Sequence, residues 1–136
     1  AEDAEDEEQP KFFCPGSLLR LELGAEPGHP LLPGLGKSLA ILYHGGPVFM
    51  ITTEDSSSEA SGNSPGATLP GRYPGSNPLL SGWIQSPEVI ERAGALAGVT
   101  VGRGRAVLFG FSPYRRAQTT GSFRLLFNAI LLGSSN

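Results

Sequence analysis

Glycine and proline together account for 31 of the 136 residues, and this density constrains the fold more than any other feature of the sequence. Average usage of the two residues is roughly half as high. Proline removes a backbone hydrogen-bond donor and glycine favours turns, so long helices and uninterrupted strands fit in only a few stretches. We therefore expect one domain rich in loops, since 136 residues also lie within the usual size of a single domain.

Acidic residues are concentrated in the first ten positions, although the formal net charge of the whole chain is only -3. A like-charged block without large apolar side chains cannot bury enough surface to offset the entropy of ordering. We therefore interpret residues 1–10 as an acidic, disordered linker. Residues 11–136 hold ten bases and seven acids, so the expected folded part is mildly basic. The six acids of the first block are Glu2, Asp3, Glu5, Asp6, Glu7 and Glu8.

Several classes of protein are disfavoured by simple counts. No apolar run reaches the roughly 18 to 20 residues of a membrane helix, so we expect no membrane insertion. A single cysteine, Cys14, permits no internal disulfide. Two histidines, His29 and His44, are too few for a usual three-ligand metal site without well-spaced carboxylates. We therefore expect no metal and no cofactor in this chain.

Short apolar runs predict a sheet. Apolar and polar residues alternate over residues 17–23, which predicts a strand. Residues 39–43 and 48–52 are expected to form two strands around a turn, and residues 53–78 an irregular region that is polar and rich in turn residues. Residues 95–101 and 106–111 predict a hairpin closed by the Gly-Arg-Gly-Arg turn at 102–105.

Two helices are predicted near the end of the chain. Ser86, Pro87 and Glu88 form an N-cap pattern for a short helix that reaches about Ala93. From about Thr120 to Leu132, apolar residues recur at helical spacing, which predicts an amphipathic helix packed on the sheet. The face expected to pack consists of Phe123, Leu126, Phe127 and Ile130.

The segment that joins the last strand to the last helix is the candidate binding site. In open α/β sheets ligands gather outside the carboxyl ends of the strands, which would place residues 113–118 at a site. Tyr114, Arg115 and Gln118 are the candidates within it, and Trp83 is the fourth candidate. The simpler interpretation is a capped loop whose arginines bind carbonyl groups, with Trp83 packed in the core.

Five of the ten basic residues fall within 22 positions, which raises the question of nucleic-acid binding. No recognisable binding motif with interleaved aromatic residues accompanies them. We therefore expect a solvated or internally paired basic face and no nucleic-acid partner. The five are Arg103, Arg105, Arg115, Arg116 and Arg124.

Three stretches together resemble the C-terminal region of large bacterial zinc carboxypeptidases. They are GRGRAVLFGFSPYRRAQTTGSFRLLFNAILLG at 102–133, PGSLLRLEL at 15–23 and RYPGSNPLLSGW at 72–83. Proteins of that family carry a carboxypeptidase A-like metallopeptidase domain followed by a class I glutamine-amidotransferase-like, flavodoxin-like domain. The resemblance implies that residues 11–136 are the C-terminal part of this second, accessory domain.

The resemblance implies an α/β fold, mainly a β sheet with a packed C-terminal helix, flavodoxin-like and either whole or an incomplete half. Zinc is expected only in a separate catalytic domain, because His29 is followed by Pro30 and not by a zinc-binding motif. An amidotransferase triad also has no counterpart, since Cys14 lies in the wrong context. The implied partner is the upstream peptidase domain or the N-terminal half of the same fold, in a secreted or periplasmic protein.

The leading hypothesis is a non-catalytic accessory domain of a zinc carboxypeptidase-like protein, with a structural or substrate-positioning role. The alternative is a self-sufficient module that binds a peptide, a glycan or an anion through residues 113–118 and the polar loop. Whether the chain has enzymatic activity is left open by the sequence, although no catalytic constellation can be assembled from it.

Overall fold

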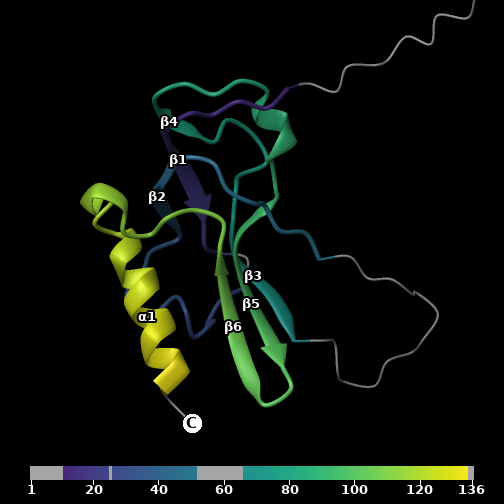
Figure 1. The fold of residues 1–136 in the computed structure, drawn as a ribbon, viewed down its shortest axis with the longest axis vertical. Coiled ribbons are helices and arrows are strands. Elements are labelled where there is room, and N and C mark those ends of the chain that lie inside the picture. The colour runs from purple at the N-terminus through teal and green to yellow at the C-terminus, as the bar shows by residue number, and fades with distance from the viewer. Residues whose placement is uncertain (1–10, 25, 52–65, 135–136) are drawn as a thin grey trace, which may run out of the picture.

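The computed structural model describes residues 11–24, 26–51 and 66–134. These residues form six strands, two 3-10 turns and one α-helix (Figure 1). In chain order the elements are β1 (Ser17–Glu22), β2 (Ser38–Tyr43), β3 (Ala67–Arg72), β4 (Leu79–Ser81), η1 (Pro87–Val89), β5 (Gly94–Val101), β6 (Gly104–Phe109), η2 (Arg115–Ala117) and α1 (Ser122–Ser134).

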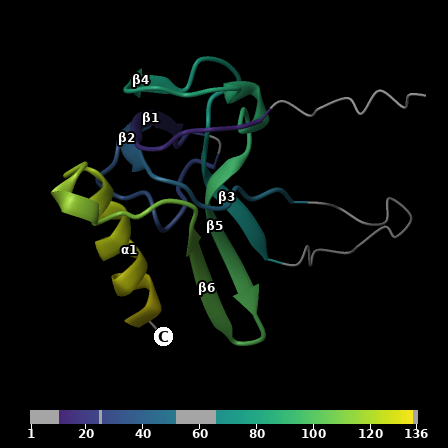
Figure 2. The same ribbon diagram turned by 45° about the horizontal axis from the view of Figure 1, so that its top comes forward.

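The strands form one sheet in the order β2-β1-β3-β5-β6, and β4 also pairs with β1. Every strand pair among the described residues is antiparallel. Helix α1 lies on one side of the sheet beside β2, and the tip of the β5–β6 hairpin extends away from the rest (Figures 1 and 2). The prediction of a mainly β fold with a packed C-terminal helix is confirmed, and the flavodoxin-like relation stays a prediction.

The strand predicted at 17–23 is confirmed as β1, and its alternation has the expected cause. Ser17, Leu19 and Leu21 are buried, whereas Arg20 and Glu22 lie on the opposite face. The next predicted strand is confirmed as β2, which pairs with β1 over all six residues. The hydrophobic core contains Leu19, Leu21, Leu31, Ile41, Tyr73, Ile90, Leu96 and Leu125.

The strand expected at 48–52 is wrong for the described residues 48–51. Only Phe49 pairs, through two backbone hydrogen bonds of 2.8 Å with Gly94. Gly94 is the first residue of β5, and further along this strand both edges are occupied by β3 and β6. A longer strand therefore finds no free partner, and Met50 and Ile51 remain exposed.

The irregular region expected at 53–78 is wrong in its second part, where β3 forms. Residues 52–65, which include most of the polar loop, lie outside the described residues. In β3, the four residues from Thr68 to Gly71 oppose only three residues of β5, 96–98, so one extra residue forms a bulge beside Pro70. A bulge accommodates proline because that residue need not donate to the ladder. Gly71 fits closely against β1, since a Cβ there would lie 3.0 Å from Leu21 Cδ2.

The hairpin prediction at 95–111 is confirmed by β5 and β6. Val101 pairs with Gly104, which leaves Gly102 and Arg103 as a two-residue loop. Gly102 has a φ of 59°, as the first central position of a type II′ turn requires. The turn therefore has a structural explanation.

The helix predicted from Ser86 to Ala93 is only one 3-10 turn, η1. Ser86 has a φ of 55° and its side chain makes no capping hydrogen bond, so the expected N-cap is wrong. Arg92 has a φ of 62°, and a left-handed residue cannot continue a right-handed helix. Between them, buried Ile90 is anchored in the core.

Helix α1 confirms the element predicted at 120–132, but its buried face differs from the predicted one. Phe127 and Ile130 are 58% and 59% exposed, whereas Leu125 and Asn128 are buried. Polar contacts explain the orientation, because Asn128 Nδ2 donates to the carbonyl oxygens of Leu31 (2.8 Å) and Pro33 (3.0 Å). Buried amides need such partners, so these bonds outweigh the larger apolar area on the other side.

Candidate functional site

Residues 113–118, the predicted binding segment, lie between β6 and α1 and include η2. Arg115 Nη1 lies 3.2 Å from Nδ1 of His44, so its guanidinium already has a partner in the protein. Tyr114 is 66% exposed and borders a hollow of about 410 Å³ beside the 45–47 turn and Leu126. Gln118 is exposed, and its backbone N–H donates to the Arg115 carbonyl at 2.9 Å.

Trp83, the fourth predicted site residue, belongs to a different cluster. The backbone N–H of Trp83 donates to Ser17 Oγ at 2.8 Å. The Ser17 hydroxyl donates in turn to the Trp83 carbonyl oxygen at 2.7 Å. The indole is half exposed and forms an edge-to-face pair with Phe13, with ring centroids 5.7 Å apart. Within the described parts of the chain no hydrogen bond or ring contact joins Trp83 to residues 113–118.

The rule that ligands bind at the carboxyl ends of parallel strands predicted a site at residues 113–118, but it does not apply to the observed antiparallel sheet. In a parallel sheet the carboxyl ends of all strands lie at the same end of the sheet. In an antiparallel sheet they alternate between its two ends. Tyr114, Arg115 and Gln118 therefore lie together on one segment, but the carboxyl ends of the strands do not gather there. Their role in binding stays a prediction.

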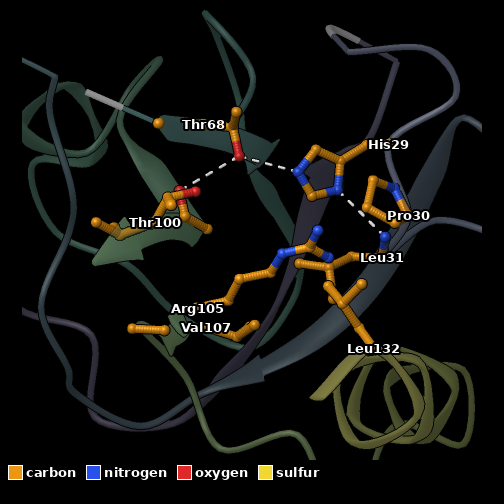
Figure 3. A pocket seen from close by; sticks show the side chains of 12 residues that line it. His29, Pro30, Leu31, Thr68, Thr100, Arg105, Val107 and Leu132 are labelled. Carbon is orange, nitrogen blue, oxygen red and sulfur yellow. Dashed lines mark hydrogen bonds between the residues drawn. The ribbon is translucent and has the colours of Figure 1, made fainter. Parts of the chain in front are cut away.

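A pocket of about 200 Å³ lies between β3, the β5–β6 hairpin and the end of α1 (Figure 3). We call it the histidine pocket. Its polar side carries His29, Thr68, Thr100 and Arg105. The Arg105 side chain extends from β6 across the pocket toward His29, as Figure 3 shows. Its apolar side is formed by Pro30, Leu31, Val107 and Leu132.

Hydrogen bonds determine the tautomer of His29. The backbone N–H of Leu31 donates to Nδ1 at 3.2 Å, so Nδ1 carries no proton. Nε2 must then carry the proton, and it donates to Thr68 Oγ1 at 2.9 Å. The Thr68 hydroxyl in turn donates to the Gly98 carbonyl at 3.4 Å. Burial lowers the pKa of His29 below its ordinary 6.5, against the opposing charge of Glu26.

This arrangement suits binding better than proton transfer. Both nitrogens of the imidazole are engaged within the protein, so His29 offers neither a free base nor a free acid to a ligand. The pocket can hold a small group against its apolar side, beside the hydroxyls and a guanidinium. Thr68 was not recognisable from the sequence because it lay in a stretch interpreted as loop, and the alternation of β3 is hidden by Pro70 and Gly71.

Cys14 is buried beside two tyrosines and is not an activated nucleophile. Burial raises the pKa of its thiol above the ordinary 9.0, although hydrogen bonds from the Ser17 side chain and the Gly16 backbone lower it. Burial also raises the pKa values of Tyr43 and Tyr73, whose rings pack edge to face at 6.3 Å. A thiol of this kind is mostly protonated near neutral pH and reacts slowly.

An apolar face of α1 is left open. Phe127, Ile130 and Leu131 are 58%, 59% and 65% exposed, and Phe123 and Leu126 are half-buried beside them. The only charged residue of the helix is Arg124, whose Nε donates to the Pro33 carbonyl at 3.2 Å. We call these five apolar residues the open helix face.

In the described ranges, no three His, Cys, Asp or Glu side chains gather closely enough to hold a metal ion. Within the same ranges, no helix has the length and apolarity needed to span a membrane. Comparison of the chain with protein-family models, with curated proteins and with solved structures gives no match.

Proposed function

We propose that this chain is a non-catalytic accessory domain that packs, through the open helix face, against another part of a zinc carboxypeptidase-like protein. Its role would be structural or substrate-positioning. The observation that supports this function best is the exposure of Phe127, Ile130 and Leu131 on a helix that buries Ser122, Leu125 and Asn128 on its other side. Contiguous exposed apolar patches on soluble proteins commonly mark interaction surfaces.

Burial of this face would be favourable. Covering a large apolar side chain completely contributes roughly 1.5–3 kcal/mol, and three side chains here are more than half exposed. No charged side chain interrupts the face, because Arg124 is directed to the Pro33 carbonyl. An apolar domain surface is therefore a better match for this face than an acidic or basic one.

The location of the protein and of its catalytic domain is proposed from the sequence resemblance alone. The resemblance implies that the peptidase chemistry and its zinc belong to a separate domain, and that the whole protein lies in the periplasm or outside the cell. A flavodoxin-like fold is built on parallel strands, so this part requires the antiparallel strands described above to extend a parallel sheet formed by other residues.

The first test combines the coding sequence with hydrogen exchange. The reading frame should encode a zinc peptidase domain next to this chain, and amides of residues 126–132 should exchange at least tenfold more slowly in the whole protein than in the isolated chain. A frame without such a domain contradicts the carboxypeptidase part. Unchanged exchange in the whole protein contradicts the docking part.

A matched pair of variants isolates the helix face. Ile130→Lys together with Leu131→Lys should abolish the added protection while leaving the melting temperature of the isolated chain unchanged, because both side chains are already exposed. Val101→Lys is the control, since Val101 is 65% exposed at the hairpin and lies off the helix. Equal loss of protection in the control would show a non-specific effect of charge and overturn the assignment.

The alternative, a self-sufficient module for a peptide, glycan or anion, predicts a different response. Ligand would then raise the melting temperature of the isolated chain. For residues 113–118, Arg115→Ala should weaken that stabilisation. An unchanged response would exclude this segment as the binding site.

A further inference from the structure

A second hollow gathers basic side chains from segments that are far apart in the sequence. It has a volume of about 870 Å³ and is lined in part by Arg20, Lys37, Arg72 and Arg92, with Glu22 as the only acidic residue among the lining side chains. We call it the arginine cleft. Its formal charge is +3, although the whole chain carries -3. Acidic residues of the cleft itself therefore do not neutralise it.

The register of the sheet explains how the cleft is assembled. Glu22 on β1 lies opposite Ser38 on β2 and opposite Arg72 on β3. Arg20 lies two residues before Glu22 and shares its face, away from the buried leucines of β1. Lys37 directly precedes β2 and completes this side of the cleft.

The loop between β3 and β4 holds two of the arginines in place. Arg20 Nη2 donates to the Asn77 carbonyl at 3.2 Å. The Arg92 side chain lies over Gly75, where a Cβ would be 2.9 Å from Arg92 Nε. Arg92 itself has a φ of 62°, a left-handed conformation that is unfavourable for a residue other than glycine. Backbone strain of this kind is often found at functional positions.

Among the described residues, the bond from Arg20 to the Asn77 carbonyl is the only side-chain hydrogen bond that a charged group of the cleft forms. Nε of Arg20 and Nε of Arg72 are shielded from solvent and have no hydrogen-bond partner among the described residues. In the described part of the chain, no ion pair within 4.0 Å joins Glu22 to the cations of the cleft. A ligand in the cleft cannot reach these two shielded atoms, but an anionic ligand would offset the net positive charge of the guanidinium and ammonium groups that line it.

We propose that the arginine cleft binds an acidic peptide segment. Arginine guanidinium groups bind carboxylates in a fork with two hydrogen bonds, and three arginines can bind several neighbouring carboxylates. The charges are spread over a cleft of about 870 Å³, much more than one small anion fills. Glu22 and Ser38 provide acceptors for peptide N–H groups. This inference does not depend on the proposed function, because it concerns the isolated chain.

The test uses a fluorescent peptide with the sequence of residues 1–9, AEDAEDEEQ, and fluorescence anisotropy at low and moderate salt. The protein is the full chain with its own N-terminal acids neutralised so that they cannot compete (Glu2→Gln, Asp3→Asn, Glu5→Gln, Asp6→Asn, Glu7→Gln and Glu8→Gln). Arg72→Gln together with Arg92→Gln should weaken binding by about tenfold or more, as loss of charge-assisted hydrogen bonds predicts. Lys37→Gln serves as a second variant if the double variant does not fold.

The control is Arg103→Gln, which removes one charge at the exposed hairpin tip and should change binding by less than about twofold. An uncharged peptide, AQNAQNQQQ, should bind at least about tenfold more weakly than the acidic one. Equal weakening by Arg103→Gln would show general charge attraction and overturn the proposal. Displacement of the labelled peptide by inorganic phosphate at lower concentrations than by unlabelled peptide would indicate a phosphate site and overturn it too.

Discussion

The histidine pocket and the arginine cleft lie on the same sheet, but the ring nitrogens of His29 and the Nε atoms of Arg20 and Arg72 differ in their hydrogen bonding. In the pocket both nitrogens of His29 form hydrogen bonds, with the Leu31 N–H and the Thr68 hydroxyl. In the cleft, Nε of Arg20 and of Arg72 has no such partner among the described residues. Because buried polar groups in folded proteins are usually paired, the pocket is explained by the fold alone and the cleft is not.

This difference separates stability from binding. A residue whose hydrogen bonds end within the protein stabilises the folded state, and its removal leaves buried partners unpaired. A residue without internal partners contributes little to folding and remains available to a ligand. Substitutions in the pocket should therefore lower the free energy of unfolding, and those in the cleft should change binding.

The largest expected effect is the loss of stability in His29→Ala. The change removes two hydrogen bonds and leaves the N–H of buried Leu31 without its acceptor, which costs about 2 kcal/mol in the free energy of unfolding. Urea denaturation followed by circular dichroism measures this value. Thr68→Ser is the control, because it keeps the hydroxyl that accepts from His29 and should lose less than about 1 kcal/mol. A loss of equal size in both variants would contradict the tautomer-specific network.

Acidification should produce a smaller loss of stability, which also comes from His29. Burial lowers the pKa of folded His29, so the unfolded chain binds a proton first as the pH falls below 6.5. Stability is therefore complete above pH 6.5, declines below it, and stops declining once the pH is below the folded-state pKa. Melting temperatures between pH 5 and 7 test this, with His29→Gln as the reference that removes the effect. An identical pH dependence in His29→Gln would assign the effect to other groups.

The local parts of the fold were predictable because neighbouring residues determine them. The alternation of leucines specifies β1, and Gly102 specifies the turn between β5 and β6. Strand β3 was missed because its bulge beside Pro70 depends on pairing with β5. The buried face of α1 was predicted wrongly because Asn128 binds carbonyl groups of residues that precede it by more than 90 positions.

The candidate sites were less predictable, since they depend on side chains brought together by tertiary structure. Arg20 and Glu22 were visible as the polar side of a strand, but nothing in their spacing links them to Arg72 or Arg92. Register and the β3–β4 loop create that proximity. The arginines clustered at 103–124 were expected to be solvated or paired within the protein, and Arg115 contacts His44 while Arg124 donates to the Pro33 carbonyl.

The smallest expected effect is a gain in stability when the arginine cleft loses a charge. Arg92→Gln relieves repulsion among the cleft cations and should raise the free energy of unfolding by about 0.5 kcal/mol, the size usual for exposed charges. Added salt should stabilise the original chain more than the variant, because salt screens the same repulsion. Arg103→Gln should show neither effect. If Arg92→Gln instead destabilises the fold at every salt concentration, the cleft arginines are structural and the comparison with the histidine pocket fails.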